Sequence, residues 1–83
     1  MMKVRIDVML KNGVLDPQGK AVGHALGTLG FQGVGEVRVG RTIELDLTAS
    51  TPEAAKEQAK AMAEKLLANL VIEDFRITVL DGQ

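Results

Sequence analysis

The chain has 83 residues, and its ten lysines and arginines against eleven acidic residues give a formal net charge of −1. This length predicts a single domain over residues 1–83. The near-neutral charge, with no cluster of basic residues, argues against a nucleic-acid partner. The sequence has no cysteine and one histidine, so disulfides and cysteine-based zinc sites are not available to stabilise a small core. We therefore expect self-association, as a homodimer or higher oligomer, to add stability.

The apolar run at the N-terminus is interrupted by charges at Lys3, Arg5 and Asp7. A signal peptide or a membrane-spanning helix requires a longer uninterrupted apolar stretch. The lack of cysteine also fits a reducing compartment. The sequence therefore predicts a cytoplasmic protein with no membrane partner.

Strict alternation of apolar and charged residues predicts a strand over residues 2–10, with one face buried. A helix is predicted to begin after Asp16, because aspartate caps free N–H groups and Pro17 suits the first helical position. Gly30 is placed to end this helix. Its apolar stripe, spaced to face a core, consists of Val22, Ala25, Leu26 and Leu29.

Residues 36–47 predict two strands joined by a tight turn. A three-residue turn at Gly40-Arg41-Thr42 places Val39 opposite Ile43 and Val37 opposite Leu45. Opposed residues then share a face, whereas a two-residue turn would mix the faces. The sequence therefore predicts a hairpin with the three-residue turn.

The second half of the chain predicts one helix and one strand. Thr51-Pro52 repeats the cap-and-proline signal and opens the helix. The apolar stripe of this helix is predicted to contain Ala55, Ala59, Met62, Leu66 and Leu70, with Ala63 at its edge. The final strand is predicted to turn one apolar face inward, carrying Phe75, Ile77 and Val79.

The resulting order is β-α-β-β-α-β, which predicts an α+β fold. We expect a two-layer ferredoxin-like sandwich, with an antiparallel four-stranded sheet and two helices on one face. In that topology the sheet edges are the strands at 36–39 and 75–80.

The residues predict no catalytic, cofactor-binding or metal-binding site. His24 is expected to face solvent, because it lies about 160° from the apolar stripe of its helix at 100° per residue. Glu44 and Asp46 share a strand face, but arginines are expected on the same face, so ion pairs are favoured over a catalytic pair of carboxylates. The glycines at 33, 35 and 40 do not join a strand to a helix, as a phosphate-binding loop requires.

Gly19, Gly23 and Gly27 are spaced four residues apart on the first predicted helix. Each interior glycine costs about 1 kcal/mol relative to alanine. Two interpretations remain open: a tolerated drift in sequence, or a flat strip that lets another backbone approach closely.

Three ordered blocks, VLDPQGKAV, LGFQGVGEVRVGRTIEL and KLLANLVIEDF, resemble the PurS family across nearly the whole chain. PurS proteins are small subunits of phosphoribosylformylglycinamidine (FGAM) synthase. Gly23 and Gly27 depart from the family pattern, in which ordinary polar or small residues are expected.

The resemblance implies a non-catalytic but required subunit that bridges a PurL-like synthetase subunit and a PurQ-like glutamine amidotransferase subunit and supports ammonia transfer. It implies that this chain binds no cofactor, while ATP and magnesium are used by the synthetase subunit. The predicted partner or dimer contacts are Arg5, Gly23, Gly27, Arg38, Arg41, Glu44 and Arg76. A regulatory domain that binds an amino acid at a dimer interface is the alternative, and a small acyl-phosphate hydrolase ranks last because the first loop lacks arginine.

Overall fold

A computed structural model describes residues 1–80 and contains three strands and two helices, the second of which ends in a π-helical turn. In chain order these elements are β1 (Met2–Leu10), α1 (Pro17–Thr28), β2 (Arg41–Leu47), α2 (Pro52–Met62), η1 (Ala63–Leu67) and β3 (Glu73–Leu80). Both predicted N-caps are confirmed: the Asp16 carboxylate accepts from Gly19 N and the Thr51 hydroxyl accepts from Ala54 N. Within residues 1–80, no helix has the length and apolar character that a membrane span requires.

The sheet is antiparallel with the order β2-β1-β3, so the first strand of the chain lies at its centre. Ile6 pairs with Ile43 on one side and with Ile77 on the other, which places the apolar side chains of all three strands on one face. The predicted alternation of the three strands is therefore confirmed. The prediction of four strands is wrong for the described chain, because only three strands form.

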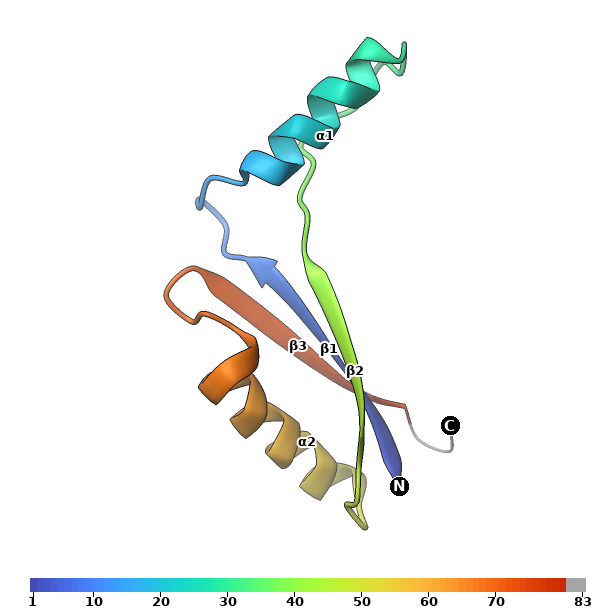
Figure 1. Cartoon of the computed structure of the whole chain (residues 1–83), viewed down its shortest axis with the longest axis vertical. Coiled ribbons are helices and arrows are strands. Elements are labelled where there is room, and N and C mark those ends of the chain that lie inside the picture. Colours follow the sequence, from blue (N-terminus) through green and yellow to red (C-terminus); the bar gives the residue numbers. More distant parts are fainter. Residues whose placement is uncertain (81–83) are drawn as a thin grey trace.

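The missing strand is the segment at residues 36–39, which continues straight out from β2 instead of folding back on it (Figure 1). The hairpin prediction is wrong, since Ile43 pairs with Ile6 and not with Val39. Two contacts explain the straight path. Val39 N–H donates to the Asp16 carboxylate at 2.9 Å, and the backbone of Gly40 lies so close to Val8 and Met9 that a side chain there would clash.

The sheet edges are therefore β2 and β3. The predicted edge at residues 75–80 is confirmed, whereas the edge predicted at residues 36–39 is wrong because those residues lie outside the sheet. On the other side of β1, the sheet ends at β2.

The core lies between the apolar face of the sheet and α2. Val4, Ile6 and Val8 of β1 are fully buried, and they face a row of fully buried alanines on the helix, Ala55, Ala59 and Ala63. The predicted stripe of α2 is wrong in part, because Met62, Leu66 and Leu70 are exposed. The small alanines let the helix pack closely against the strands. The larger side chains of the helix therefore lie at its side and not against the sheet.

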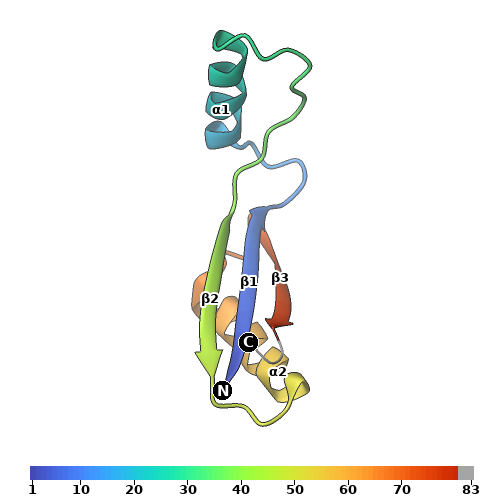
Figure 2. The same cartoon turned by 90° about the vertical axis from the view of Figure 1, so that its right-hand side faces the viewer.

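The prediction that both helices cover one face of the sheet is wrong, because α1 does not lie on the sheet. Figures 1 and 2 show α1 beyond the end of the sheet, with the chain returning beside it as an extended segment toward β2. We call residues 17–40 the arm, and the sheet with α2 and η1 the body. The radius of gyration is 16.1 Å, whereas a compact domain of this length would have about 12 Å. The arm therefore gives the chain an open, elongated shape.

The close approach of α2 to the sheet gives a first testable prediction. Replacing Ala59, which is fully buried, with leucine should lower the free energy of unfolding by about 1–3 kcal/mol, because the added atoms have no space. Glu57→Leu on the exposed side of α2 is the matched control and should change that free energy by less than about 0.5 kcal/mol. Urea unfolding would measure both, and equal effects would contradict the packing described here.

Candidate interaction surfaces

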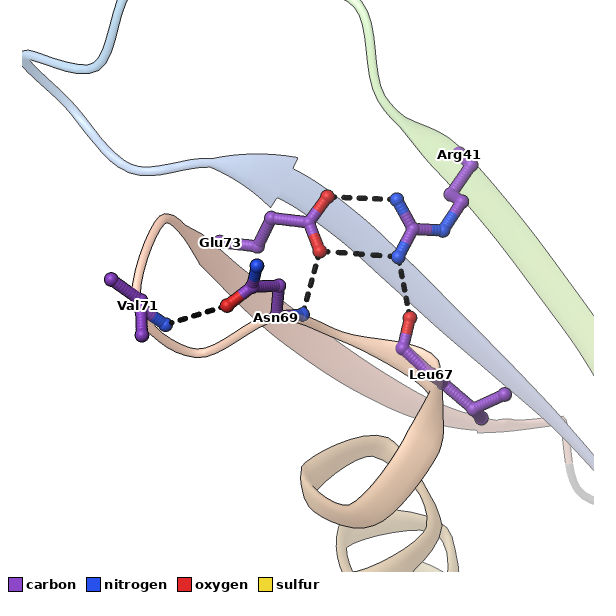
Figure 3. Close-up of polar contacts among 5 residues, drawn as sticks. All are labelled: Arg41, Leu67, Asn69, Val71 and Glu73. Atoms are coloured by element: carbon purple, nitrogen blue, oxygen red, sulfur yellow. Dashed lines mark hydrogen bonds and ion pairs between the residues drawn. The ribbon is translucent and has the colours of Figure 1, made fainter.

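Arg41 ties three elements of the body together at the end where the arm departs. It is the first residue of β2, and its guanidinium forms a bidentate pair with Glu73, the first residue of β3, at 2.8 and 3.1 Å (Figure 3). The same guanidinium donates to the Leu67 carbonyl at the end of η1. Glu73 also accepts from the backbone N–H of Asn69 at 2.7 Å. We call this set of contacts the Arg41 tie.

The charges of the Arg41 tie perturb each other. The Arg41 hydrogen bond, followed by the Asn69 N–H, lowers the pKa of Glu73 below its ordinary value, while Glu73 raises the pKa of Arg41. The Glu73 side chain is only 13% exposed. Arg41 was predicted as a partner contact, but the structure uses its guanidinium within the chain. No local sequence pattern predicts the Arg41 tie, because the two residues are 32 positions apart.

The open face of the sheet, opposite α2, carries an ordered pattern of charge. The strand register sets Lys3 opposite Asp46, Arg5 opposite Glu44, and Asp7 opposite Arg76. Asp7 also accepts from the Thr42 hydroxyl at 2.7 Å and lies 3.7 Å from Arg5 Nε. Three of the predicted contact residues, Arg5, Glu44 and Arg76, are thus brought to one face.

Arg38 joins this face from the arm. Its guanidinium donates to the Leu10 carbonyl at the end of β1. Together with Arg76, Asn12 and Asp74 it lines a hollow of about 280 Å³. The open face therefore presents side chains of opposite charge on neighbouring strands. Such a surface contributes more to the specificity for a charged partner than to the affinity.

The three glycines of α1 have different surroundings. Gly19 is buried, and a side chain there would clash with the Val37 carbonyl, so the close-approach interpretation is confirmed for this residue, within the chain itself. A Cβ at Gly23 would lie 3.4 Å from the Val37 side chain, while Gly27 has nothing within 4 Å. His24 is exposed, as predicted.

Apolar surface is left uncovered on both the arm and the body. On the arm, Val22, Leu29, Phe31 and Val34 are 41–73% exposed. On the body, an apolar groove of about 490 Å³ lies between α2 and β2, and we call it the α2–β2 groove. It is lined by Leu45, Gln58, Ala61, Met62, Lys65, Leu66 and Leu67. Sequence reasoning missed this groove because it assigned Met62 and Leu66 to the core.

These features describe a surface for binding proteins. Among residues 1–80, no three potential metal-ligating side chains gather in one place. The uncovered apolar arm, the groove and the paired charges are instead features of interaction surfaces. The fold and its surfaces thus define a small α+β subunit with an exposed arm.

Comparison with known proteins identifies the family. The family described as PurS, phosphoribosylformylglycinamidine (FGAM) synthase, matches residues 3–81. The PurS subunit of Synechocystis is 49% identical over 80 residues, which cover 94% of this chain and 80% of that protein. The PurS subunit of Bacillus subtilis is 48% identical over 79 residues, covering 95% and 93% of the two chains. The chain belongs to the PurS family.

Solved structures agree with this assignment. The crystal structure of PurS from Methanocaldococcus jannaschii superposes with a TM-score of 0.91 at 38% identity and covers all of both chains. A chain in the structure of PurLQS from Thermotoga maritima gives a TM-score of 0.87 at 33% identity, covering 95% of this chain and 96% of that one. The open shape with its arm is therefore shared with solved members of the family.

The Arg41 tie gives a second prediction, which concerns pH. Because the pKa of Glu73 is lowered on folding, its contribution to stability is present above the ordinary glutamate pKa of about 4.3 and is lost as pH falls toward the lowered value. Glu73→Gln should therefore lower the free energy of unfolding by about 1 kcal/mol at pH 7 and by less at pH 3. Chemical denaturation at the two pH values would measure this difference.

Asp74→Asn is the control, because Asp74 is the exposed neighbour of Glu73 on the same strand. It should leave the stability at pH 7 nearly unchanged. A Glu73→Gln variant as stable as the parent at both pH values would show that the tie does not stabilise the body.

Proposed function

We propose that the chain is the small, non-catalytic but required subunit of an FGAM synthase complex. That complex converts formylglycinamide ribonucleotide, glutamine and ATP to formylglycinamidine ribonucleotide, glutamate, ADP and phosphate. The chain would bridge a PurL-like synthetase subunit and a PurQ-like glutaminase subunit and support the transfer of ammonia between them. The observation that carries the proposal is the nearly full-length match to a chain of the PurLQS structure.

The surfaces of the chain support a bridging role. The arm carries exposed apolar side chains away from the body, and the open face of the sheet offers paired charges on a different side of the molecule. A subunit that contacts two different proteins needs two such separate surfaces. In this proposal ATP and magnesium are used by the synthetase subunit, this chain holds no cofactor, and the complex works in the cytoplasm, which the lack of cysteine favours.

The third prediction tests this role by reconstitution. The purified chain alone should form neither FGAM nor glutamate. Added to PurL-like and PurQ-like subunits, it should restore glutamine-dependent FGAM synthesis, measured as product formed per minute. Full glutamine-dependent activity without the chain would contradict a required role. Stabilisation of the isolated chain by an amino acid, without effect on synthesis, would favour the regulatory domain instead.

We also propose that two copies of the chain associate and complete the four-stranded ferredoxin-like sandwich between them. The arm's extended segment at residues 36–39 would join the free edge of a partner's β2, and its α1 would cover the partner's α2–β2 groove. Each copy has both halves of this contact, so one symmetric arrangement satisfies both copies.

The backbone of the arm supports this arrangement. Val37 turns its carbonyl and Val39 its N–H toward α1. In an extended chain alternate residues direct these groups to opposite sides, so Glu36 and Arg38 present theirs away from α1. Unpaired backbone groups of this kind are a template for pairing with another chain. A strand that pairs between chains would explain the alternating pattern at residues 36–39.

The fourth prediction concerns this association. Leu66 lines the groove and Val71 lies outside its lining, and both residues are 82% exposed in the single chain. Leu66→Asp should weaken self-association at least about tenfold, because it places a charge in an apolar contact. Val71→Asp is the matched control and should leave association unchanged. Sedimentation at low micromolar concentration measures both, and a monomeric parent chain would refute the dimer.

A further inference from the structure

The arm is held in shape by one carboxylate. Asp16 precedes α1, and its Oδ1 accepts from Gly19 N at 2.8 Å, as an ordinary N-cap does. Its Oδ2 accepts from Val39 N at 2.9 Å, from a residue 23 positions away on the returning segment. Both oxygens are therefore used, and one side chain joins the start of the helix to the extended segment that returns toward β2. These two hydrogen bonds, Val39 first and Gly19 second, lower the pKa of Asp16, so the carboxylate is charged at neutral pH.

Gly19 makes this junction possible. It is the buried residue of α1, and the Val37 carbonyl occupies the space that a side chain would need. Val37 and Val39 lie on the same side of the returning segment, so the two contacts act on one edge of it. The helix and the segment are thus held together at two adjacent points, which we call the Asp16 clasp.

The returning segment is in turn fixed to the body. Arg38 donates to the Leu10 carbonyl, Gly40 lies against Val8 and Met9, and Arg41 forms the tie to Glu73. These contacts hold the segment along the line of β2. The clasp then transmits that direction to α1, which lies beyond the end of the sheet, apart from α2 (Figure 2).

From this geometry we propose that Asp16 is a positioning residue for assembly. Its carboxylate, with Gly19, sets the orientation in which α1 is presented to a second copy and to the larger subunits. The proposal rests on the function proposed above. It differs from simple helix capping, because capping requires one oxygen of Asp16 and positioning requires both.

Substitution of Asp16 separates capping from positioning. Asp16→Ser retains a good N-cap but offers one oxygen, so it should keep α1 helical while releasing Val39. Exchange of the Val39 amide hydrogen should become at least about tenfold faster. Self-association and the apparent affinity of the chain for the PurL-like and PurQ-like subunits should weaken by about tenfold. Asp16→Glu, whose longer carboxylate retains two oxygens, should restore part of both properties.

Thr51→Ala is the matched control. Thr51 caps α2 by the same cap-and-proline pattern, but its hydroxyl accepts from a nearby residue, Ala54 N, three residues on. This variant should lower the thermal stability of the body and leave both Val39 exchange and subunit affinity at the parent values. An Asp16→Ser chain with unchanged Val39 exchange would overturn the clasp. Faster exchange with unchanged affinity would overturn the positioning role.

The outcomes also separate this inference from the proposed function. Val39 exchange is measured on the isolated full-length chain and depends on no partner. A parent chain that neither self-associates nor restores FGAM synthesis would contradict the proposed function. The exchange measurement would still decide whether the Asp16 clasp exists.

Discussion

The path of the chain through Gly40 determines the shape of the molecule. On one side of this residue, Val39 is bound to Asp16, and on the other, Arg41 is bound to Glu73 and to the end of η1. Both contacts hold the chain in an extended conformation. Gly40 itself lies so close to β1 that a side chain at this position would clash with it. Had the chain turned here, residues 36–39 would have formed a fourth strand within the same sheet. Because it does not turn, the sheet has three strands and α1 extends beyond it.

The straight path also explains why the core is small. Because α1 lies beyond the end of the sheet (Figure 1), the apolar face is covered by α2 and η1, whose fully buried residues are alanines. The largest fully buried side chains are Ile6, Val4 and Val8. Each large aliphatic side chain contributes about 1.5–3 kcal/mol when fully buried, and a domain of this size has little stability to spare. The single chain leaves apolar surface exposed on the arm and in the groove. Burying this surface by association would therefore add stabilisation that the single chain lacks.

Local features of the fold could be predicted from the sequence. Both N-caps, the faces of all three strands and the exposed His24 follow from residue types and spacing, because they depend on neighbours a few positions away. The charge pattern of the open face also followed, since strand alternation decides which side chains share a face.

The errors have a common physical origin. Periodicity shows that residues 36–39 suit a strand, but it does not show whether they pair with the next strand of the same chain. For α2, the spacing of apolar residues allowed either Met62 and Leu66 or the row of alanines to face the sheet, and close packing selected the alanines. The Asp16 clasp and the Arg41 tie join residues 23 and 32 positions apart, and no local pattern predicts such pairs.

We expect the two groups of contacts around Gly40, the Asp16 clasp and the Arg41 tie, to have separable effects. The Arg41 tie joins elements that lie within the body. Its loss should therefore lower the free energy of unfolding of the sheet and α2. The Asp16 clasp joins two parts of the arm, and the fully buried side chains of the core lie in β1, α2 and η1, outside the arm. We therefore expect the stability of the body to depend on Arg41 and Glu73, and we propose that assembly depends on Asp16, although both groups of contacts meet at Gly40. A substitution in this region should thus be tested by two measurements, unfolding for the body and association for the arm. One measurement alone would not distinguish a misfolded chain from a folded chain whose α1 is wrongly oriented.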